Sequence, residues 1–261
     1  MENVAVTVDM RGVARLSLAR AEKHNALSAR MMDEVTDATN RLGADPAVRV
    51  IVLAGEGRSF CAGGDLGWMQ AQRDAGAAAR AREATRLARM LQALNTCPKP
   101  LIGRVHGNAF GGGLGLISVC DVAVAAETAR FGFTETRLGL IPATIGPYVV
   151  ARMGEAMARR VFMSARLFPA GEAQALGLLA RSVPAEELDA AVEAEVTPYL
   201  SVAPGAVSEA KALLRRLGPA IDEATIAETV EALARRWESE EAAEGIAAFF
   251  EKRPARWHDQ S

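Results

Sequence analysis

The stretch "HGNAFGGGLGLISVCD", residues 106–121, is the most informative about the fold and the function of this chain, because it concentrates glycine between two apolar segments. It follows "PLIGRVHG" (100–107), which is typical of a buried strand, and it leads into "GLGLISVC" (113–120), which is typical of a short helix. Glycine inside a helix costs about 1 kcal/mol relative to alanine, so this density indicates a need for bare backbone. A strand, a glycine turn and a helix start together expose unpaired N–H groups that can bind a phosphate, a carboxylate or an enolate-like oxygen.

The two best-known glycine-rich phosphate motifs do not fit this stretch. A dinucleotide fingerprint that starts at Gly111 and Gly113 would need a third glycine where Leu116 stands. A P-loop needs Gly-Lys-Ser or Gly-Lys-Thr, and neither tripeptide occurs in the sequence. The need for bare backbone therefore has another origin.

A second glycine loop, "SFCAGGDL" (59–66), follows the apolar run "VRVIVLAG" (48–55) in the same strand-then-loop order. Two such loops at the ends of two strands can each supply one N–H to a single carbonyl oxygen, which is the arrangement of an oxyanion hole. The structural alternative is that both are simply tight turns. The matching context of the two loops favours the functional interpretation.

Strand, loop and helix patterns alternate through the first half of the chain, which predicts an α/β core with parallel sheets and functional loops at the strand ends. From residue 184 onward the pattern is almost entirely helical. We place a boundary near Pro198 and Pro204, giving a core over 1–200 and a helical region over 201–261. Such a tail either mediates oligomerisation or covers its own core, and the pattern alone fits both.

The composition excludes several classes of function. Of 261 residues, 50% are hydrophobic and 24% charged, the formal net charge is −2, and no basic block occurs, so a nucleic-acid partner is not expected. No apolar run is long enough to span a membrane, the N-terminus does not resemble a signal peptide, and we expect a cytoplasmic protein. The three cysteines form no CxxC pair and there is no histidine cluster, so neither a disulfide framework nor a metal site is expected.

The chain resembles the enoyl-CoA hydratase/isomerase (crotonase) superfamily over essentially its whole length. Five segments carry the resemblance in this order: "AEKHNAL" (21–27), "SFCAGGDL" (59–66), "RVHGNAFGGGLGL" with "CD" (104–121), "FGFTETRLGLIP" (131–142) and "EGIAAFFEKRPARW" (244–257). The resemblance implies a spiral of ββα turns closed by a C-terminal helical oligomerisation region over 201–261. It also implies a homotrimer or a dimer of trimers, with an acyl-CoA thioester as substrate, coenzyme A as part of that substrate, and no separate cofactor.

By the same resemblance, Gly64 and Gly112 supply the oxyanion-hole N–H groups and Glu135 is the catalytic acid–base. The family's hydratases carry a second glutamate at the position of Gly115, where we therefore expect the acid to be missing and the volume to be open. Three outcomes follow from that departure. Glu135 acts alone as base and acid, the chain is an isomerase, or it has lost activity.

Further residues match family positions that contact the substrate. Lys23 and Ala26 match the segment beside the CoA ribose and pantetheine, and Ala62, Asp65 and Leu66 match the adenine side. Phe249 and Lys252 match residues that reach CoA phosphate, and Trp68 is a candidate for the acyl pocket, although it fits the core equally well. The small and polar segment 70–85 is expected to form a mobile flap over the acyl chain.

The segments "AFGGGLGL" and "LGLIPATIGPYVVARMGE" resemble most the 3-methylglutaconyl-CoA hydratase-type members of leucine catabolism. The predicted function is thus hydration of a branched or carboxylated enoyl-CoA. The alternatives are a Δ3,Δ2-enoyl-CoA isomerase that uses the same base and an acyl-CoA-binding protein without catalytic activity.

Overall fold

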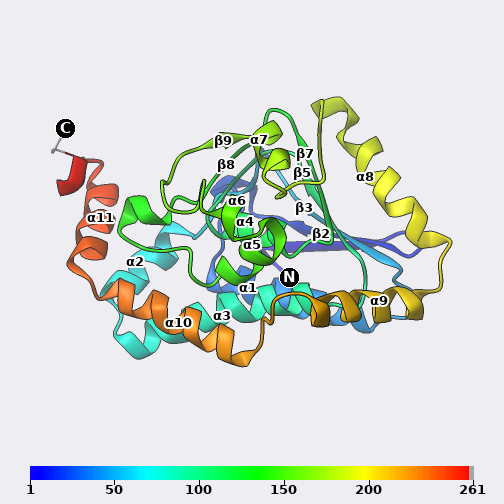
Figure 1. The fold of residues 1–261 in the computed structure, drawn as a ribbon, viewed down its shortest axis with the longest axis horizontal. Coiled ribbons are helices and arrows are strands. Elements are labelled where there is room, and N and C mark those ends of the chain that lie inside the picture. Colours follow the sequence, from blue (N-terminus) through cyan, green and yellow to red (C-terminus); the bar gives the residue numbers. More distant parts are fainter. Residues whose placement is uncertain (259–261) are drawn as a thin grey trace.

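The structure is a computed structural model that describes residues 1–258, and it is built on two β-sheets (Figure 1). The larger sheet has six strands in the order β1-β2-β3-β5-β7-β10, and the smaller sheet has four strands in the order β4-β6-β8-β9. The strands of the larger sheet are β1 (Val4–Val8), β2 (Val13–Leu18), β3 (Val50–Gly55), β5 (Leu101–Val105), β7 (Val122–Ala126) and β10 (Arg181–Val183). Those of the smaller sheet are β4 (Ser59–Cys61), β6 (Asn108–Phe110), β8 (Arg130–Gly132) and β9 (Phe168–Pro169).

The chain winds as a spiral, because three strands of the larger sheet are each followed within a few residues by a strand of the smaller one. These consecutive pairs are β3 with β4, β5 with β6, and β7 with β8. Both sheets pair these strands in parallel, so each turn of the spiral adds one strand to each sheet. The predicted crotonase-like ββα spiral is confirmed.

Eleven helices are present within residues 1–258. Those before residue 184 are α1 (Ala29–Ala44), α2 (Leu66–Asp74), α3 (Ala77–Thr96), α4 (Gly112–Ser118), α5 (Gly146–Met153), α6 (Glu155–Ala158) and α7 (Ala170–Ala175). Those after it are α8 (Leu188–Val196), α9 (Pro204–Leu217), α10 (Glu223–Trp237) and α11 (Glu240–Glu251). Short 3₁₀ turns include η1 (Ala21–Lys23) and η2 (Glu135–Leu138).

The central strand β3 shows why the apolar run "VIVLAG" is nearly continuous. All six of its residues are buried, and successive side chains enter different clusters. Ile51 and Leu53 belong to the main core with α1 and α3, whereas Val50 and Val52 pack with α8 on the other face. A strand covered on both faces has no solvent-facing positions, which removes the usual alternation of polar and apolar residues.

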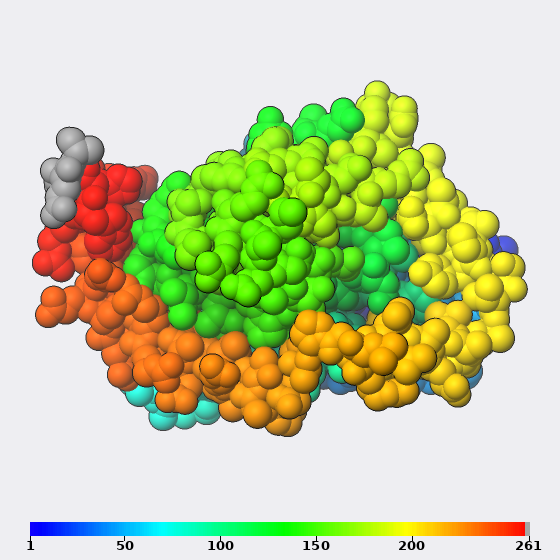
Figure 2. Space-filling model, in the orientation of Figure 1, coloured from blue at the N-terminus to red at the C-terminus, as the bar shows by residue number. Residues whose placement is uncertain are grey.

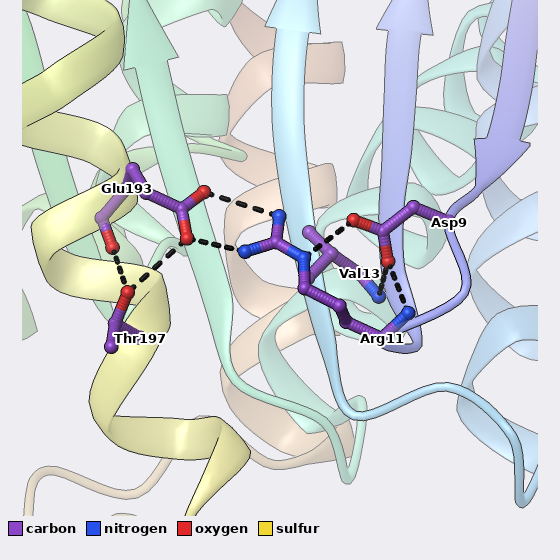
Figure 3. Close-up of polar contacts among 5 residues, drawn as sticks. All are labelled: Asp9, Arg11, Val13, Glu193 and Thr197. Carbon is purple, nitrogen blue, oxygen red and sulfur yellow. Dashed lines mark hydrogen bonds and ion pairs between the residues drawn. The ribbon is translucent and has the colours of Figure 1, made fainter.

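Helix α8 is also joined to the β1–β2 turn by a polar network at the surface (Figure 3). The Arg11 guanidinium pairs with Asp9 at 2.9 Å and with Glu193 at 2.6 Å. Thr197 donates its hydroxyl hydrogen bond to the backbone oxygen of Glu193 at 2.9 Å. Because these side chains are about half exposed, solvent screens both ion pairs and they add little to stability.

The three helices after residue 201, which are α9, α10 and α11, differ in whether they pack on the core. Helix α10 shares an apolar cluster with α3, in which Ile226, Leu233 and Trp237 pack against Ala84 and Ala88. Helix α11 lies against η2 at the far end of the molecule (Figure 1). Helix α9 has no buried residue and lies at the surface of the space-filling view (Figure 2). Two of these three helices therefore cover their own core, which was one of the two alternatives that the pattern allowed.

Residues 70–85, which are expected to form a mobile flap, are largely helical, and their mobility stays a prediction. They lie in α2 and α3, and the two helices are linked by the Trp68 indole N–H, which donates to Glu83 at 2.8 Å. Arg80 of α3 also donates to the Gln72 carbonyl at 2.8 Å. The segment is helical because these tertiary bonds and α10 support its small residues. No helix within residues 1–258 combines the length and apolarity needed to cross a bilayer.

Candidate active site

A cavity of about 380 Å³ lies between the two glycine loops, η2 and the C-terminal helices. Its walls include Gly64 and Gly112 from the loops, Glu135 from η2, and Leu233 and Phe249 from α10 and α11. Most other wall residues are apolar. An apolar cavity with a few converging polar groups is the usual form of a small-molecule site.

The two glycine loops pack directly on each other, which explains their composition. A Cβ added to Gly113 would stand 2.6 Å from the Cys61 carbonyl oxygen, and one added to Gly63 would stand 3.0 Å from the Phe110 carbonyl oxygen. Gly63 and Gly111 also have φ angles of +93° and +50°, which side-chain-bearing residues rarely adopt. Bare backbone is therefore required for close approach as well as for ligand access.

Two residues that line this cavity, Gly64 and Gly112, have backbone N–H groups without an acceptor among residues 1–258. The residues on either side of Gly64 are held by Leu27, whose N–H donates to Gly63 at 2.7 Å and whose carbonyl accepts from Asp65 at 3.0 Å. Within residues 1–258, no acceptor is found for the Gly64 N–H itself. Gly112 is the first residue of α4, where an N–H has no partner inside the helix, and it too finds no acceptor among the described residues. The positions predicted for an oxyanion hole thus have free donors at one cavity.

Glu135 begins η2 and brings a carboxylate to the same place. A Cβ added to Gly111 would stand 3.1 Å from its Oε1. Its Oε2 is buried and has no hydrogen-bond partner among the described residues. Burial raises the pKa of Glu135 from 4.5 to about 7, and a hydrogen bond from its own backbone N–H offsets only part of that effect. A carboxyl group with such a pKa can both accept and return a proton near neutral pH.

The expectation of open volume at Gly115 is wrong. A Cβ added to Gly115 would stand 2.5 Å from Cγ2 of Ile145 and 3.4 Å from Cδ2 of Leu91. Gly115 is not among the residues that line the cavity, whereas Ile145 and Thr144 are. The loop after η2 folds back over α4, and Ile145 takes the space that a side chain at 115 would occupy. Sequence reasoning missed Ile145 because nothing local links it to Gly115.

The other predicted substrate-contacting residues separate into two groups. Those on the cavity wall are Ala62, Leu66, Trp68 and Phe249. Those outside it are Lys23, Ala26, Asp65 and Lys252, and the substrate contacts predicted for both groups stay predictions. Lys23 and Lys252 are exposed, and Ala26 is buried.

Asp65 has a local structural explanation. Its carboxylate accepts from the Trp68 N–H at 2.9 Å, which caps the start of α2, and it pairs with Arg20 at 2.9 Å. The cap fixes the direction of α2 and therefore the position of Trp68 on the cavity wall.

Asn25 is a second residue that the sequence did not single out. It is fully buried in the segment before the first glycine loop. Its side chain accepts from the Arg20 N–H at 2.9 Å and donates to the carbonyls of Glu56 and Ser59, both at 2.8 Å. Asn25 therefore connects residues 20–26 to the chain that enters "SFCAGGDL".

The spiral fold, with two glycine loops and one glutamate at a shared cavity, is that of a crotonase-type protein. Residues 9–260 match the model of the enoyl-CoA hydratase/isomerase family, and the chain belongs to that family.

Its relatives include a Thermus thermophilus protein named "Putative enoyl-CoA hydratase", which is 36% identical over 97% of this chain and 100% of its own length. A crystallised enoyl-CoA hydratase from Shewanella pealeana is 38% identical, with a TM-score of 0.80 over 98% of this chain and 96% of that one. Pseudomonas aeruginosa AtuE is 35% identical, with a TM-score of 0.81 over 98% of this chain and 99% of that one.

Proposed function

We propose that the protein is an enoyl-CoA hydratase that adds water across the α,β double bond of an enoyl-CoA thioester. The observation that carries this proposal is a cavity shared by Glu135, whose buried Oε2 has no hydrogen-bond partner among the described residues, and by Gly64 and Gly112, whose N–H groups have no acceptor there. A thioester oxygen placed between Gly64 and Gly112 accepts both hydrogen bonds. Those bonds strengthen as negative charge moves onto the oxygen, so they stabilise the transition state more than the ground state.

In the proposed reaction, the Glu135 carboxylate removes a proton from water as its oxygen bonds to Cβ, and the double-bond electrons move toward the thioester oxygen. The protonated Glu135 then returns the proton to Cα as the enolate collapses. The product contains one added water, and the carboxylate is restored. A pKa near neutrality suits a group that acts first as base and then as acid.

The decisive experiment is an activity screen over straight, branched and carboxylated enoyl-CoAs. Hydration is measured as the loss of the absorbance of the conjugated thioester. We expect Glu135→Gln to reduce hydration by about 10³-fold or more, since it removes both proton transfers. Glu155→Gln is the matched control, because Glu155 of α6 is an exposed carboxylate that pairs with Arg159 at 2.9 Å. Unchanged turnover in Glu135→Gln would exclude the assigned role.

For the substrate, we propose a branched or carboxylated acyl group of the 3-methylglutaconyl-CoA type. One structural observation supports a distal carboxylate. Arg137, which donates to the Ala165 carbonyl at 3.2 Å, is the single cationic side chain among the described residues lining the cavity. Coenzyme A enters as part of the substrate, and no separate cofactor is proposed.

An isomerase is the second candidate, because Gly115 leaves the site with one carboxylate and isomerisation needs only one base. Incubation with a 3-enoyl-CoA distinguishes the two reactions, since an isomerase makes conjugated absorbance appear and a hydratase does not. Tight acyl-CoA binding without turnover of any substrate in the screen would favour the non-catalytic alternative.

We also propose a homotrimer or a dimer of trimers, with α9 at the interface. Helix α9 has no buried residue and exposes Leu213, Leu214 and Leu217, the last two at 70% and 75%. Large exposed apolar side chains grouped on one helix are typical of a protein interface. Light scattering after size exclusion should show the oligomer for the native chain and a smaller species for Leu214→Glu combined with Leu217→Glu. An unchanged mass in the double variant would exclude α9 from the interface.

A further inference from the structure

The contact between Gly115 and Ile145 lies directly behind the cavity wall, because Ile145 lines the cavity and Gly115 does not. Gly112 and Gly115 are three residues apart in α4, so they lie on one face of the helix about one turn, or roughly 5 Å, apart. Gly112 presents a proposed oxyanion-hole N–H. The side chain that covers Gly115 therefore stands close to where the reacting carbons of a bound thioester would lie.

That side chain belongs to Ile145, which is 2% exposed and contributes to the cavity wall. Behind it lies packed core. A Cβ added to Gly115 would meet Ile145 first, at 2.5 Å, and Leu91 of α3 next, at 3.4 Å. Leu91 is fully buried and is not among the residues that line the cavity. A single side chain thus separates the acyl pocket from the α3–α4 packing.

We propose that Ile145 is a specificity-determining residue that limits the size of the acyl group beside the reacting carbons, and that glycine at 115 is the complement that lets it fit. The proposal rests on the proposed acyl-CoA function of this cavity. Shortening Ile145 enlarges a space that is continuous with the cavity and does not create a sealed void. Adding a side chain at 115 forces Ile145 toward the substrate.

The test compares kcat/KM over a series of straight-chain and β-branched enoyl-CoAs for the native enzyme and four variants. We expect Ile145→Ala to raise the ratio of kcat/KM for long or branched substrates to kcat/KM for short ones by about 10-fold or more. This is the discrimination that an apolar pocket obtains from one to a few methylene groups. Gly115→Ala should raise KM for all substrates. Combining Gly115→Ala with Ile145→Ala should return KM toward the native value, because the added methyl group then occupies the space that Ile145 has left.

Val149→Ala is the matched control. Val149 lies one turn further along α5, is fully buried and is not among the cavity-lining residues, so its truncation costs stability without altering the pocket. A substrate ratio in Ile145→Ala equal to that in Val149→Ala would overturn the proposal. So would strictly additive effects of the substitutions at 115 and 145.

Calorimetric binding of saturated acyl-CoAs of graded length separates this inference from the reaction itself. If the native enzyme hydrates nothing, the proposed function fails, yet a shift of the Kd series toward longer chains in Ile145→Ala would still support the inference. An unshifted series would overturn it. The same binding series decides the question if Gly115→Ala does not fold, because it needs only Ile145→Ala and its control.

Discussion

The Glu135 carboxylate lies directly over Gly111, the residue that precedes the first N–H of α4. Its Oε1 is 3.1 Å from the point where a Cβ on Gly111 would stand. The proposed base therefore contacts Gly111, and the next residue, Gly112, carries one of the proposed oxyanion donors. Their relative positions do not depend on any flexible side chain other than that of Glu135.

Gly111→Ala should lower kcat by about 10-fold or more. The new methyl displaces the carboxylate, the φ of +50° strains a residue with a Cβ, and a misplacement of about 1 Å can cost 10²-fold. Steady-state kinetics of the purified variant measure the effect. Gly171→Ala is the control, because Gly171 is exposed on α7 and nothing lies within 4 Å of a Cβ at that position. Equal kcat values for the two variants would contradict this placement of Glu135.

The pH dependence of kcat/KM should show one ionisation near neutrality. Burial raises the pKa of Glu135 to about 7, and the carboxylate is the form that accepts a proton from water. Activity should therefore fall as the pH drops through about 7 and level off above it, because kcat/KM reports groups of the free enzyme. A profile that is flat between pH 5 and 8 would be inconsistent with a buried Glu135 carboxylate as the base.

The same carboxylate should destabilise the fold at high pH. The pKa of Glu135 is about 7 when folded and near 4.5 when unfolded, so the folded state binds more protons between these values and stability falls as the pH rises through that window. Glutamine carries no charge. Glu135→Gln should therefore be more stable than the native chain above pH 7, by up to about 3 kcal/mol, and equal to it near pH 4.

Urea unfolding at pH 4.5 and at pH 8 measures this difference. Glu155→Gln again serves as the comparison and should show no such pH-dependent gain. A Glu135→Gln variant that is less stable than the native chain at pH 8 would mean that the carboxylate has a stabilising partner.

Arg137→Gln should discriminate between carboxylated and uncharged substrates. If the guanidinium pairs with a distal carboxylate, its loss should lower kcat/KM for 3-methylglutaconyl-CoA by about 10- to 100-fold, as for other hydrogen-bonded charges. It should leave crotonyl-CoA nearly unaffected. Parallel kinetics with both substrates check this, and an equal loss for both would assign Arg137 a structural role through its bond to Ala165.

The elements that the sequence predicted well have strong local patterns. The buried strand β3 is a continuous apolar run, and α1 is preceded by Ser28, whose side chain caps the helix by accepting from the Met31 N–H. The glycine loops were also recognisable, because glycine at close contacts and positive φ has few substitutes. Strands β4 and β6 were missed inside those loops, since they have three residues each and no alternation to read.

The parts that sequence reasoning missed depend on contacts between distant segments. Ile145 meets Gly115 across 30 residues of chain, and no periodicity connects them. The same holds for the C-terminal region, whose helical pattern fitted both an oligomer interface and a cover for the core. Only the three-dimensional packing shows that α10 and α11 lie on the body of the molecule and that α9 does not bury a single residue.

The cavity is assembled from both ends of the chain, with Leu27 on one wall and Phe249 on another. If α10 and α11 separated locally from α3 and η2, part of the pocket would be lost while the spiral stayed folded. A ligand that fills the cavity can bind only the closed form, so it must suppress that opening. Amide hydrogen exchange in these two helices should slow on binding. The exchange rate in α10 and α11 therefore reports whether the cavity holds a ligand.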